Sequence, residues 1–464
     1  MTKLLSAAGF IALVSLVFAC GSEGGGGPDG GGPDAGWQPP FNPAVCGIKQ
    51  YQWLDPSTMG KVIKYEKIIE TTMDKETITE LLKGFGFDFI TPQYGVKSFK
   101  FMYETQDRGV KTTATAIFSY PDSAATLDAP YALWLHGTCG WSDKCAASGF
   151  FEWKLLPVLL ASQGFITVAP DYIGMNGMEP ASTIKAPYMV GEPTALASLD
   201  ALRAAPSMIK KTGASAKIKP NNKTIIWGPS QGGHATLFTD LYAPYYAEQF
   251  NVVGAVALIP PSRLVTWTEE VVKNYGEGTA YATYIPVALS RWYGYESRLG
   301  EVLAPAIAST LPGRMDTECV INFPDAKKSS DLFTQNYIDR VTDGSWTTME
   351  PWYCMTSENS IGSTSVKRIN DTPIFFVTAG SDELIPIAGS RSDFDKLCAA
   401  GYDMDYLECK YAKHVEGGTW SMPEQMEWAS GRLAGKPLAN PCIRTDPVCC
   451  KGTIAPVGEC IKTK

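Results

Sequence analysis

The chain is 464 residues long, and its 45% hydrophobic and 19% charged residues are typical of a folded protein with ample material for a core. Its formal net charge is −8. No run of lysine and arginine offers the basic patch that neutralises phosphate, so we expect no nucleic-acid partner.

The first 40 residues are predicted to serve export and anchoring. Lys3 precedes an apolar stretch at residues 4–18, which is short for a membrane span and suits a secretory signal peptide. The stretch closes on the sequence VFACG, which resembles a bacterial lipoprotein box with Cys20 as the lipidated residue. The alternative is an ordinary signal peptide that is cut before Cys20. The glycine-rich residues 21–40 predict a flexible tether between membrane and domain. We therefore expect an exported, membrane-anchored bacterial lipoprotein, or otherwise a secreted protein.

From residue 96 to residue 259 the chain alternates between strand-like and helix-like stretches. Two of the strands flank a turn at residues 106–109 and predict a hairpin. The expected strands are 98–103, 111–120, 129–135, 165–169, 225–227, 251–259, 372–378 and 405–411, and the expected helices include 151–162, 193–210 and 391–400. Apolar strands that alternate with helices predict an α/β fold with a mostly parallel central sheet and helices on both faces.

The alternation stops between residues 261 and 370. This segment is rich in tryptophan and tyrosine and predicts mainly helix, and we interpret it as an inserted cap. Most of its aromatic side chains are expected to form the cap's own core, and some to line an apolar pocket. The predicted organisation is a core at 41–260 and 371–435, the cap at 261–370, and a cysteine-rich tail at 436–464.

The 12 cysteines agree with export, because closely spaced cysteines in an exported protein indicate disulfides. A metal site is disfavoured, since Cys-x2-Cys pairs with partner histidines are absent. We expect three local bonds and one long-range bond: Cys139–Cys145, Cys319–Cys354, Cys398–Cys409, and Cys46 with the cluster of Cys442, Cys449, Cys450 and Cys460. If Cys20 carries lipid, 11 cysteines remain and one of them must be unpaired.

The motif GPSQG at residues 228–232 follows a β-branched run and precedes a helix-compatible stretch. Strand, Gly-x-Ser-x-Gly turn and helix together are typical of a nucleophile elbow, whose glycines let the backbone hold the serine exposed at the tip of the turn. Serine is a poor nucleophile unless a base removes its proton and an acid orients that base. Ser230 is therefore the candidate nucleophile, and an acid and a histidine should follow it in the chain.

Three histidines are present, and one of them fits the base. His414 comes directly after the last predicted strand, in an expected loop. His234 follows the elbow on the same helix and is expected to pack or cap. His136 lies at a strand end and is expected to shape the oxyanion loop.

The candidate acid is Asp382, in the turn after the strand at residues 372–378. Glu383 is kept as an alternative, although Asp382 comes first off the strand end. Asp171 also follows a strand, but it precedes Ser230 in the chain, so we interpret it as structural.

The oxyanion that forms on attack needs two backbone N–H donors. Gln231, directly after the serine, is expected to supply one of them. Thr138, in the loop after His136 and Gly137, is expected to supply the other. A Cys139–Cys145 bond would stiffen that loop. We expect no cofactor and no metal, because the serine mechanism needs neither.

The chain resembles an α/β-hydrolase of the secretory lipase family, the group that includes yeast lipase-A-type enzymes and bacterial relatives. The likeness spans Val96 to Gly418 and lies in these segments: 135–137 (LHG), 169–174 (APDYIG), 188–191 (YMVG), 199–205 (LDALRAA), 228–234 (GPSQGGH) and 380–386 (GSDELIP). The resemblance implies hydrolysis of carboxylic esters under an inserted cap, with a small-molecule or lipid ester as the substrate.

We therefore expect an exported serine carboxylic-ester hydrolase, a lipase or esterase, that works through an acyl-enzyme on Ser230. An acyltransferase or a peptidase with the same triad is the alternative within this class. Outside it, the alternative is a non-catalytic hydrolase fold that serves as a surface binding module.

Overall fold

The structure, a computed structural model, describes residues 41, 43–454 and 456–460. The predicted signal segment, Cys20 and the tether lie outside the described residues. None of the helices in the described part is long and apolar enough to cross a membrane.

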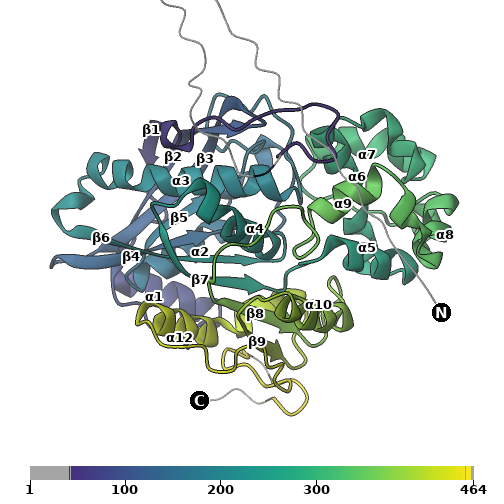
Figure 1. Ribbon diagram of the computed structural model, residues 1–464. Coiled ribbons are helices and arrows are strands. Elements are labelled where there is room, and N and C mark those ends of the chain that lie inside the picture. Colours follow the sequence, from purple (N-terminus) through teal and green to yellow (C-terminus); the bar gives the residue numbers. More distant parts are fainter. Residues whose placement is uncertain (1–40, 42, 455, 461–464) are drawn as a thin grey trace, which may run out of the picture. The chain divides into compact units, whose positions relative to one another are not determined.

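The described strands form one sheet in the order β1-β2-β3-β5-β4-β6-β7-β8-β9 (Figure 1). Their bounds are β1 Val62–Lys67, β2 Gly95–Asp107, β3 Val110–Asp122, β4 Leu127–Trp134, β5 Ile166–Pro170, β6 Ile218–Pro229, β7 Asn251–Leu258, β8 Ile374–Ala379 and β9 Met404–Cys409. The three pairs from β1 to β5 are antiparallel, and every pair from β5 to β9 is parallel. The predicted α/β fold is confirmed, as is the hairpin formed by β2 and β3.

Helices cover both faces of the sheet, with α3 on one side and α1 and α12 on the other (Figure 1). The helices of the sheet region are α1 Lys75–Gly84, α2 Phe151–Ser162, α3 Gly191–Lys211, α4 Gln231–Tyr246, α10 Ile387–Ala399, α11 His414–Trp420 and α12 Met422–Leu433. Leu160 of α2 and Ala429 of α12 pack with strand residues such as Ile225 and Val256 in a buried cluster. The predicted helix at 151–162 has the bounds of α2, because a continuous apolar stretch there meets the buried sheet.

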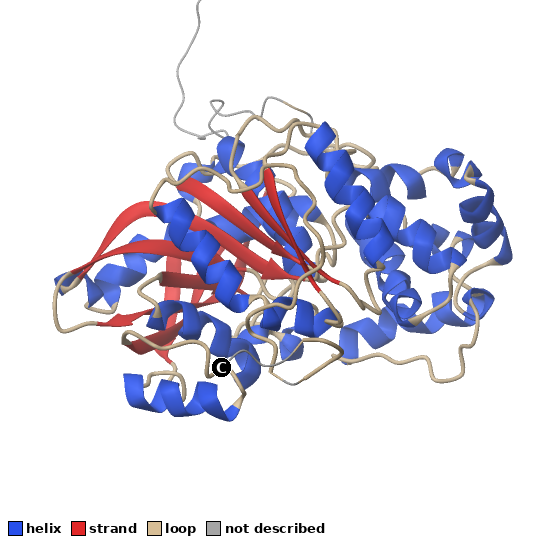
Figure 2. Cartoon of the chain, turned by 90° about the horizontal axis from the view of Figure 1, so that it is seen from below, coloured by secondary structure: helices blue, strands red, loops and turns tan. Residues whose placement is uncertain are grey.

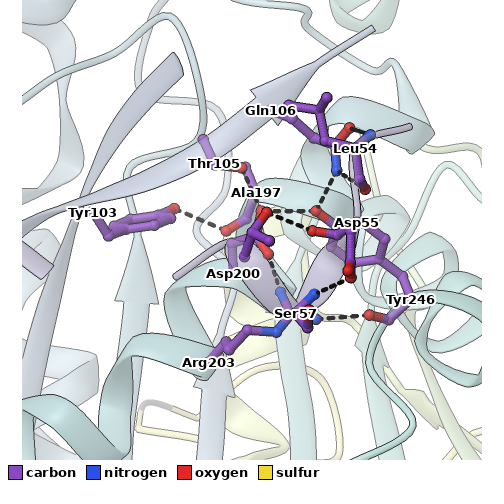
Figure 3. A network of polar contacts seen from close by, with 11 residues as sticks. Leu54, Asp55, Ser57, Tyr103, Thr105, Gln106, Ala197, Asp200, Arg203 and Tyr246 are labelled. Atoms are coloured by element: carbon purple, nitrogen blue, oxygen red, sulfur yellow. Dashed lines mark hydrogen bonds and ion pairs between the residues drawn. The ribbon is translucent and has the colours of Figure 1, made fainter. Parts of the chain in front are cut away.

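A buried polar network fixes α3 against its neighbours (Figure 3). Asp200 is fully buried and accepts hydrogen bonds from the hydroxyls of Thr105 on β2 (2.7 Å) and Tyr246 on α4 (3.0 Å). Arg203, one turn along α3, forms an ion pair with the same carboxylate. A buried charge must be partnered in this way, so the network ties one helix to a strand and to a second helix.

The segment between β7 and β8 is folded mainly as helix, as its composition predicts. Its α-helices are α5 Leu264–Lys273, α6 Glu277–Tyr293, α7 Pro305–Thr317, α8 Gln335–Asp343 and α9 Trp352–Glu358. These helices gather at one end of the sheet, in green in Figure 1 and away from the strands in Figure 2. We call residues 264–358 the helical insertion.

The predicted disulfide pairs are wrong. The structure pairs Cys46 with Cys354, Cys145 with Cys319, Cys398 with Cys442, Cys409 with Cys450, and Cys449 with Cys460. Four of these bonds join residues more than 40 apart in the chain, and such pairs depend on the tertiary fold and not on spacing. Cys139 is the free cysteine among the described residues.

Two of the observed bonds hold the helical insertion. Cys145–Cys319 ties it to the loop that follows β4, and Cys46–Cys354 ties it to the segment before β1. The C-terminal tail is attached by Cys398–Cys442 and Cys409–Cys450. In the tail, the Val448 N–H donates to the Glu408 carbonyl (3.0 Å), and the Lys410 N–H donates to the Val448 carbonyl (2.7 Å). The tail therefore runs along β9, the last strand of the sheet.

Candidate active site

Ser230 lies between β6 and α4 in a strained backbone conformation, with φ 56° and ψ −118°. A positive φ is uncommon for a residue other than glycine and marks a site that its surroundings hold in place. The Ser230 N–H donates to the Leu258 carbonyl of the neighbouring strand (2.9 Å). A Cβ at Gly232 would collide with the Leu135 carbonyl oxygen, and one at Gly228 with the Gly232 carbonyl oxygen. Both glycines are therefore required by close backbone approach, as the elbow motif predicts.

Asp382 and His414 are in direct contact. The His414 Nδ1 lies 2.9 Å from each carboxylate oxygen of Asp382. Asp382 Oδ1 also accepts hydrogen bonds from the backbone N–H groups of Leu384 (2.9 Å) and Ile385 (2.8 Å). These donors fix the carboxylate at the end of β8, and the carboxylate in turn fixes the orientation of the imidazole ring.

Glu383 has a different position from Asp382. Its Oε2 accepts a hydrogen bond from the backbone N–H of His414 (3.1 Å), so it holds the main chain beside the imidazole and does not contact the ring nitrogen. His414 is the first residue of α11 and lies outside the loop in which we expected it. Gly417 explains this difference, because a Cβ there would lie 2.7 Å from Ala379 and 2.8 Å from Ile259, so the glycines serve close helix packing.

The loop after β4 lies against the elbow. Trp134 at the end of β4 pairs with Trp227 of β6, and a Cβ at Gly137 would lie 3.4 Å from the Pro229 carbonyl oxygen. Thr138 follows directly, and its Oγ1 is 2.9 Å from the Tyr188 hydroxyl. On the other side of the elbow, Gln231 is the first residue of α4, where backbone N–H groups have no partner within the helix.

The helix that carries the histidine also reaches the elbow. A Cβ at Gly418 of α11 would lie 3.8 Å from Pro229. His414 is 5% exposed, and its Nε2 has no hydrogen-bond partner among the described residues. The nitrogen that would serve as a base is therefore buried and available, while the other nitrogen is held by Asp382.

The other two histidines are buried and packed. Burial lowers the pKa of His136 and of His234 to about 4, so both are neutral. The His136 ring packs against Tyr172 with centroids 4.2 Å apart. The His234 Nε2–H donates to the Asn359 carbonyl of the helical insertion (2.8 Å). The contact of His234 agrees with the packing role that the sequence predicts for it, whereas the expected role of His136 in shaping the oxyanion loop stays a prediction.

Asp171 is fully buried and structural. It accepts hydrogen bonds from the hydroxyl of Thr115 (2.6 Å) and from the N–H and hydroxyl of Ser148 (both 2.7 Å). Burial raises the pKa of Asp171 to about 6. It anchors the segment after β5 to β3, and it belongs to a different part of the chain from the elbow.

Three features of the site were not predicted from the sequence. They are the hydroxyl contact of Tyr188 with Thr138, the bond of Glu383 to the His414 backbone, and the disulfide from Cys145 to the helical insertion. Tyr188 lies in one of the segments that carry the family resemblance, which is the one signal that points to it. The other two depend on tertiary contacts that leave no periodic pattern in the sequence.

Known proteins resemble this chain in sequence and in fold. The model of a family described as secretory lipase matches residues 151–441. Lipase 1 of Candida albicans is 28% identical over 301 residues, which cover 63% of this chain and 60% of that protein. The chain thus spans less than two thirds of the length of this curated relative.

Two solved structures share the fold. The rice cell wall degrading esterase LipA from Xanthomonas oryzae is 17% identical with a TM-score of 0.63, over 81% of this chain and 97% of that one. Candida antarctica lipase A in its closed state is 17% identical with a TM-score of 0.61, over 91% of this chain and 92% of that one. At this identity the likeness establishes the fold alone.

Proposed function

The chain belongs to the secretory lipase family, and from that premise we propose that it is an exported serine hydrolase that cleaves carboxylic esters. The observation that carries the proposal is the imidazole of His414 held by the Asp382 carboxylate, on a helix that packs against the strained elbow of Ser230. These three residue types in this chain order are what an α/β-hydrolase triad requires.

The proposed reaction begins when Ser230 Oγ attacks the ester carbonyl carbon and His414 accepts the hydroxyl proton. Asp382 orients the imidazole and stabilises its charged form. The negative charge on the carbonyl oxygen is received by the backbone N–H groups of Gln231 and Thr138. The intermediate expels the alcohol, which takes the proton from His414 and leaves the acyl group on Ser230. Water, deprotonated by His414, then attacks the acyl-enzyme, and the bond to Ser230 Oγ breaks to release the acid while His414 returns the proton to Ser230 Oγ.

We also propose that the chain is exported and that Cys20 carries a lipid anchor. Five disulfides and membership of a secretory family support export. The anchor rests on the sequence at residues 17–21 and the glycine-rich stretch after it. Mass spectrometry of the mature N-terminus separates the alternatives, because a lipidated Cys20 adds the mass of its acyl chains, whereas simple cleavage adds none.

The test of the activity is hydrolysis of p-nitrophenyl esters of increasing acyl length by the purified protein, beside the Ser230→Ala variant. We expect turnover by the native protein and none above background by the variant, with labelling of Ser230 by a fluorophosphonate probe. Thermal unfolding of both proteins controls for folding.

The same assay separates the alternatives. Release of transfer products in the presence of an added alcohol or amine would indicate an acyltransferase, and cleavage of peptides without cleavage of esters would indicate a peptidase. A folded protein that neither hydrolyses esters nor reacts with the fluorophosphonate would be a binding module.

A further inference from the structure

Tyr188 and Thr138 form a pair of hydroxyl groups beside the elbow, with 2.9 Å between the phenol oxygen and Thr138 Oγ1. We propose that Tyr188 donates to Thr138 Oγ1 and so directs the Thr138 hydroxyl hydrogen toward the oxyanion, as a third donor beside the two backbone N–H groups. Thr138 then contacts the reacting oxygen through its side chain, and Tyr188 is a positioning residue that acts through Thr138. This inference rests on the proposed ester hydrolysis at Ser230.

The direction of the hydrogen bond follows from the burial of Tyr188. Its residue is 6% exposed, and Thr138 Oγ1 is the hydrogen-bond partner of its hydroxyl among the described residues. A buried hydroxyl hydrogen without an acceptor is costly, so the phenol donates to Thr138. Because a hydroxyl has one hydrogen, Thr138 keeps its own hydrogen for a different acceptor. Thr138 is partly exposed, which leaves room for that acceptor to be a substrate.

The position of Thr138 relative to the elbow supplies the second argument. A Cβ at Gly137 would lie 3.4 Å from the Pro229 carbonyl oxygen, so the loop that carries Thr138 passes the residue just before Ser230. Tyr172 donates its hydroxyl hydrogen to the His136 carbonyl (2.9 Å), two residues before Thr138. The loop is thus held at its backbone by one tyrosine and at its Thr138 side chain by another.

The surroundings of Tyr188 keep its hydroxyl in place. Its ring has edge contacts with Trp141 (centroids 6.0 Å apart) and with Tyr284 of the helical insertion (6.4 Å). The following residue, Met189, has a φ of 58°, a conformation that a non-glycine residue adopts where its surroundings impose it. Donors that are fixed before the reaction stabilise developing charge best, because they need no reorganisation.

The test is a double-mutant cycle on the ester hydrolysis assay. For Tyr188→Phe we expect kcat to fall roughly fivefold to tenfold with KM unchanged, the effect of losing one neutral hydrogen bond in the transition state. For Thr138→Val we expect a loss of about 10²-fold, as for an oxyanion donor. Tyr188→Phe should cost no further activity when Thr138 is already valine, whereas in Thr138→Ser, which keeps the hydroxyl, it should cost the same as in the native protein.

A second readout separates positioning from stability. A boronic acid that forms a tetrahedral adduct with Ser230 should bind more weakly to Tyr188→Phe by the same factor as kcat falls. Tyr103→Phe is the matched control, because it removes a buried tyrosine hydroxyl that donates to the Ala197 carbonyl (2.9 Å) of α3 and not to the loop that carries Thr138. That control should lower the unfolding temperature and leave kcat and boronate affinity unchanged.

The inference is overturned if Tyr188→Phe leaves kcat within twofold of the native value, or if its effect adds in full to that of Thr138→Val. Either outcome alongside an inactive Ser230→Ala leaves the proposed hydrolysis intact. Ester turnover that survives Ser230→Ala would instead overturn the proposed function itself.

Discussion

Single side chains decide which carboxylate serves His414. Asp382 contacts the imidazole Nδ1 at 2.9 Å, whereas Glu383 accepts from the backbone N–H of His414. Asp382→Asn should lower kcat by roughly 10⁴-fold, because an amide no longer fixes the tautomer or stabilises the charged imidazole. Glu383→Gln keeps an oxygen acceptor for the same N–H and should lower kcat less than tenfold. Steady-state kinetics of the two variants checks this, and equal losses would contradict the assignment.

The room around the backbone at the elbow also depends on single residues. Gly232→Ala should abolish ester hydrolysis and lower the unfolding temperature, because its Cβ would collide with the Leu135 carbonyl oxygen. Gly431→Ala in α12 is the control, since a Cβ there would meet no atom within 4 Å. It should leave activity unchanged and stabilise the protein by up to about 1 kcal/mol, the difference in helix propensity. Activity and thermal unfolding of both variants are the measurements.

The buried carboxyl of Glu192 should make the free energy of unfolding depend on pH. Burial raises the pKa of Glu192 to about 8. The Tyr51 hydroxyl, 3.1 Å from both carboxyl oxygens, and the Trp53 indole N–H, 3.0 Å from Oε1, donate to the carboxyl and offset part of this rise. The carboxyl ionises in the unfolded chain near its ordinary pKa of 4.5, so the folded state binds the proton more tightly.

The direction of the pH dependence follows from the difference between the folded and unfolded pKa values of Glu192. The stabilisation is complete below a pH of about 4.5 and is lost as the pH rises to about 8, at no more than about 1.4 kcal/mol per pH unit. Glu192→Gln should flatten this part of the curve of unfolding free energy against pH. Denaturant unfolding between pH 5 and 8 measures it, and an unchanged slope in the variant would refute the raised pKa.

At the scale of elements, the two disulfides of the helical insertion should have different effects. Cys145–Cys319 ends the loop that carries Thr138, whereas Cys46–Cys354 joins the insertion to the segment before β1. Removing either bond by paired alanine substitutions should lower the unfolding temperature, because each closes a loop of more than 170 residues. Loss of the first bond alone should also lower kcat, since it frees the loop that is proposed to supply the Thr138 oxyanion donor. Equal kcat in both variants would contradict this link.

Elements with a strong local pattern were predictable from the sequence. The helix at 151–162, the elbow at 228–232 and the strand before Asp382 match the structure, because apolar runs and glycine spacing report directly on local conformation. β1 has no such pattern, as five of its six residues are exposed at the edge of the sheet. The start of α11 at His414 was missed because its two glycines are typical of a loop.

At the scale of the whole molecule, the candidate catalytic residues were easier to predict from the sequence than the disulfide bonds and the contacts between loops. Ser230, Asp382 and His414 could be proposed from chain order and residue type, because the mechanism constrains both. The disulfides could not, since the fold brings together cysteines as distant as Cys46 and Cys354. The hydroxyl contact of Tyr188 likewise depends on how two loops meet, and neither loop's sequence encodes the other's position.

The course of the tail along β9 has a consequence for solubility. A free strand at the end of a sheet exposes N–H and C=O groups on which other chains can add strands and aggregate. Val448 already occupies the Glu408 carbonyl and the Lys410 amide, and Cys409–Cys450 keeps it there. Because that bond forms only under oxidising conditions, a chain retained in a reducing compartment would present this edge to its neighbours. Folding in an oxidising compartment therefore keeps this edge of the sheet covered against the addition of a strand from another chain.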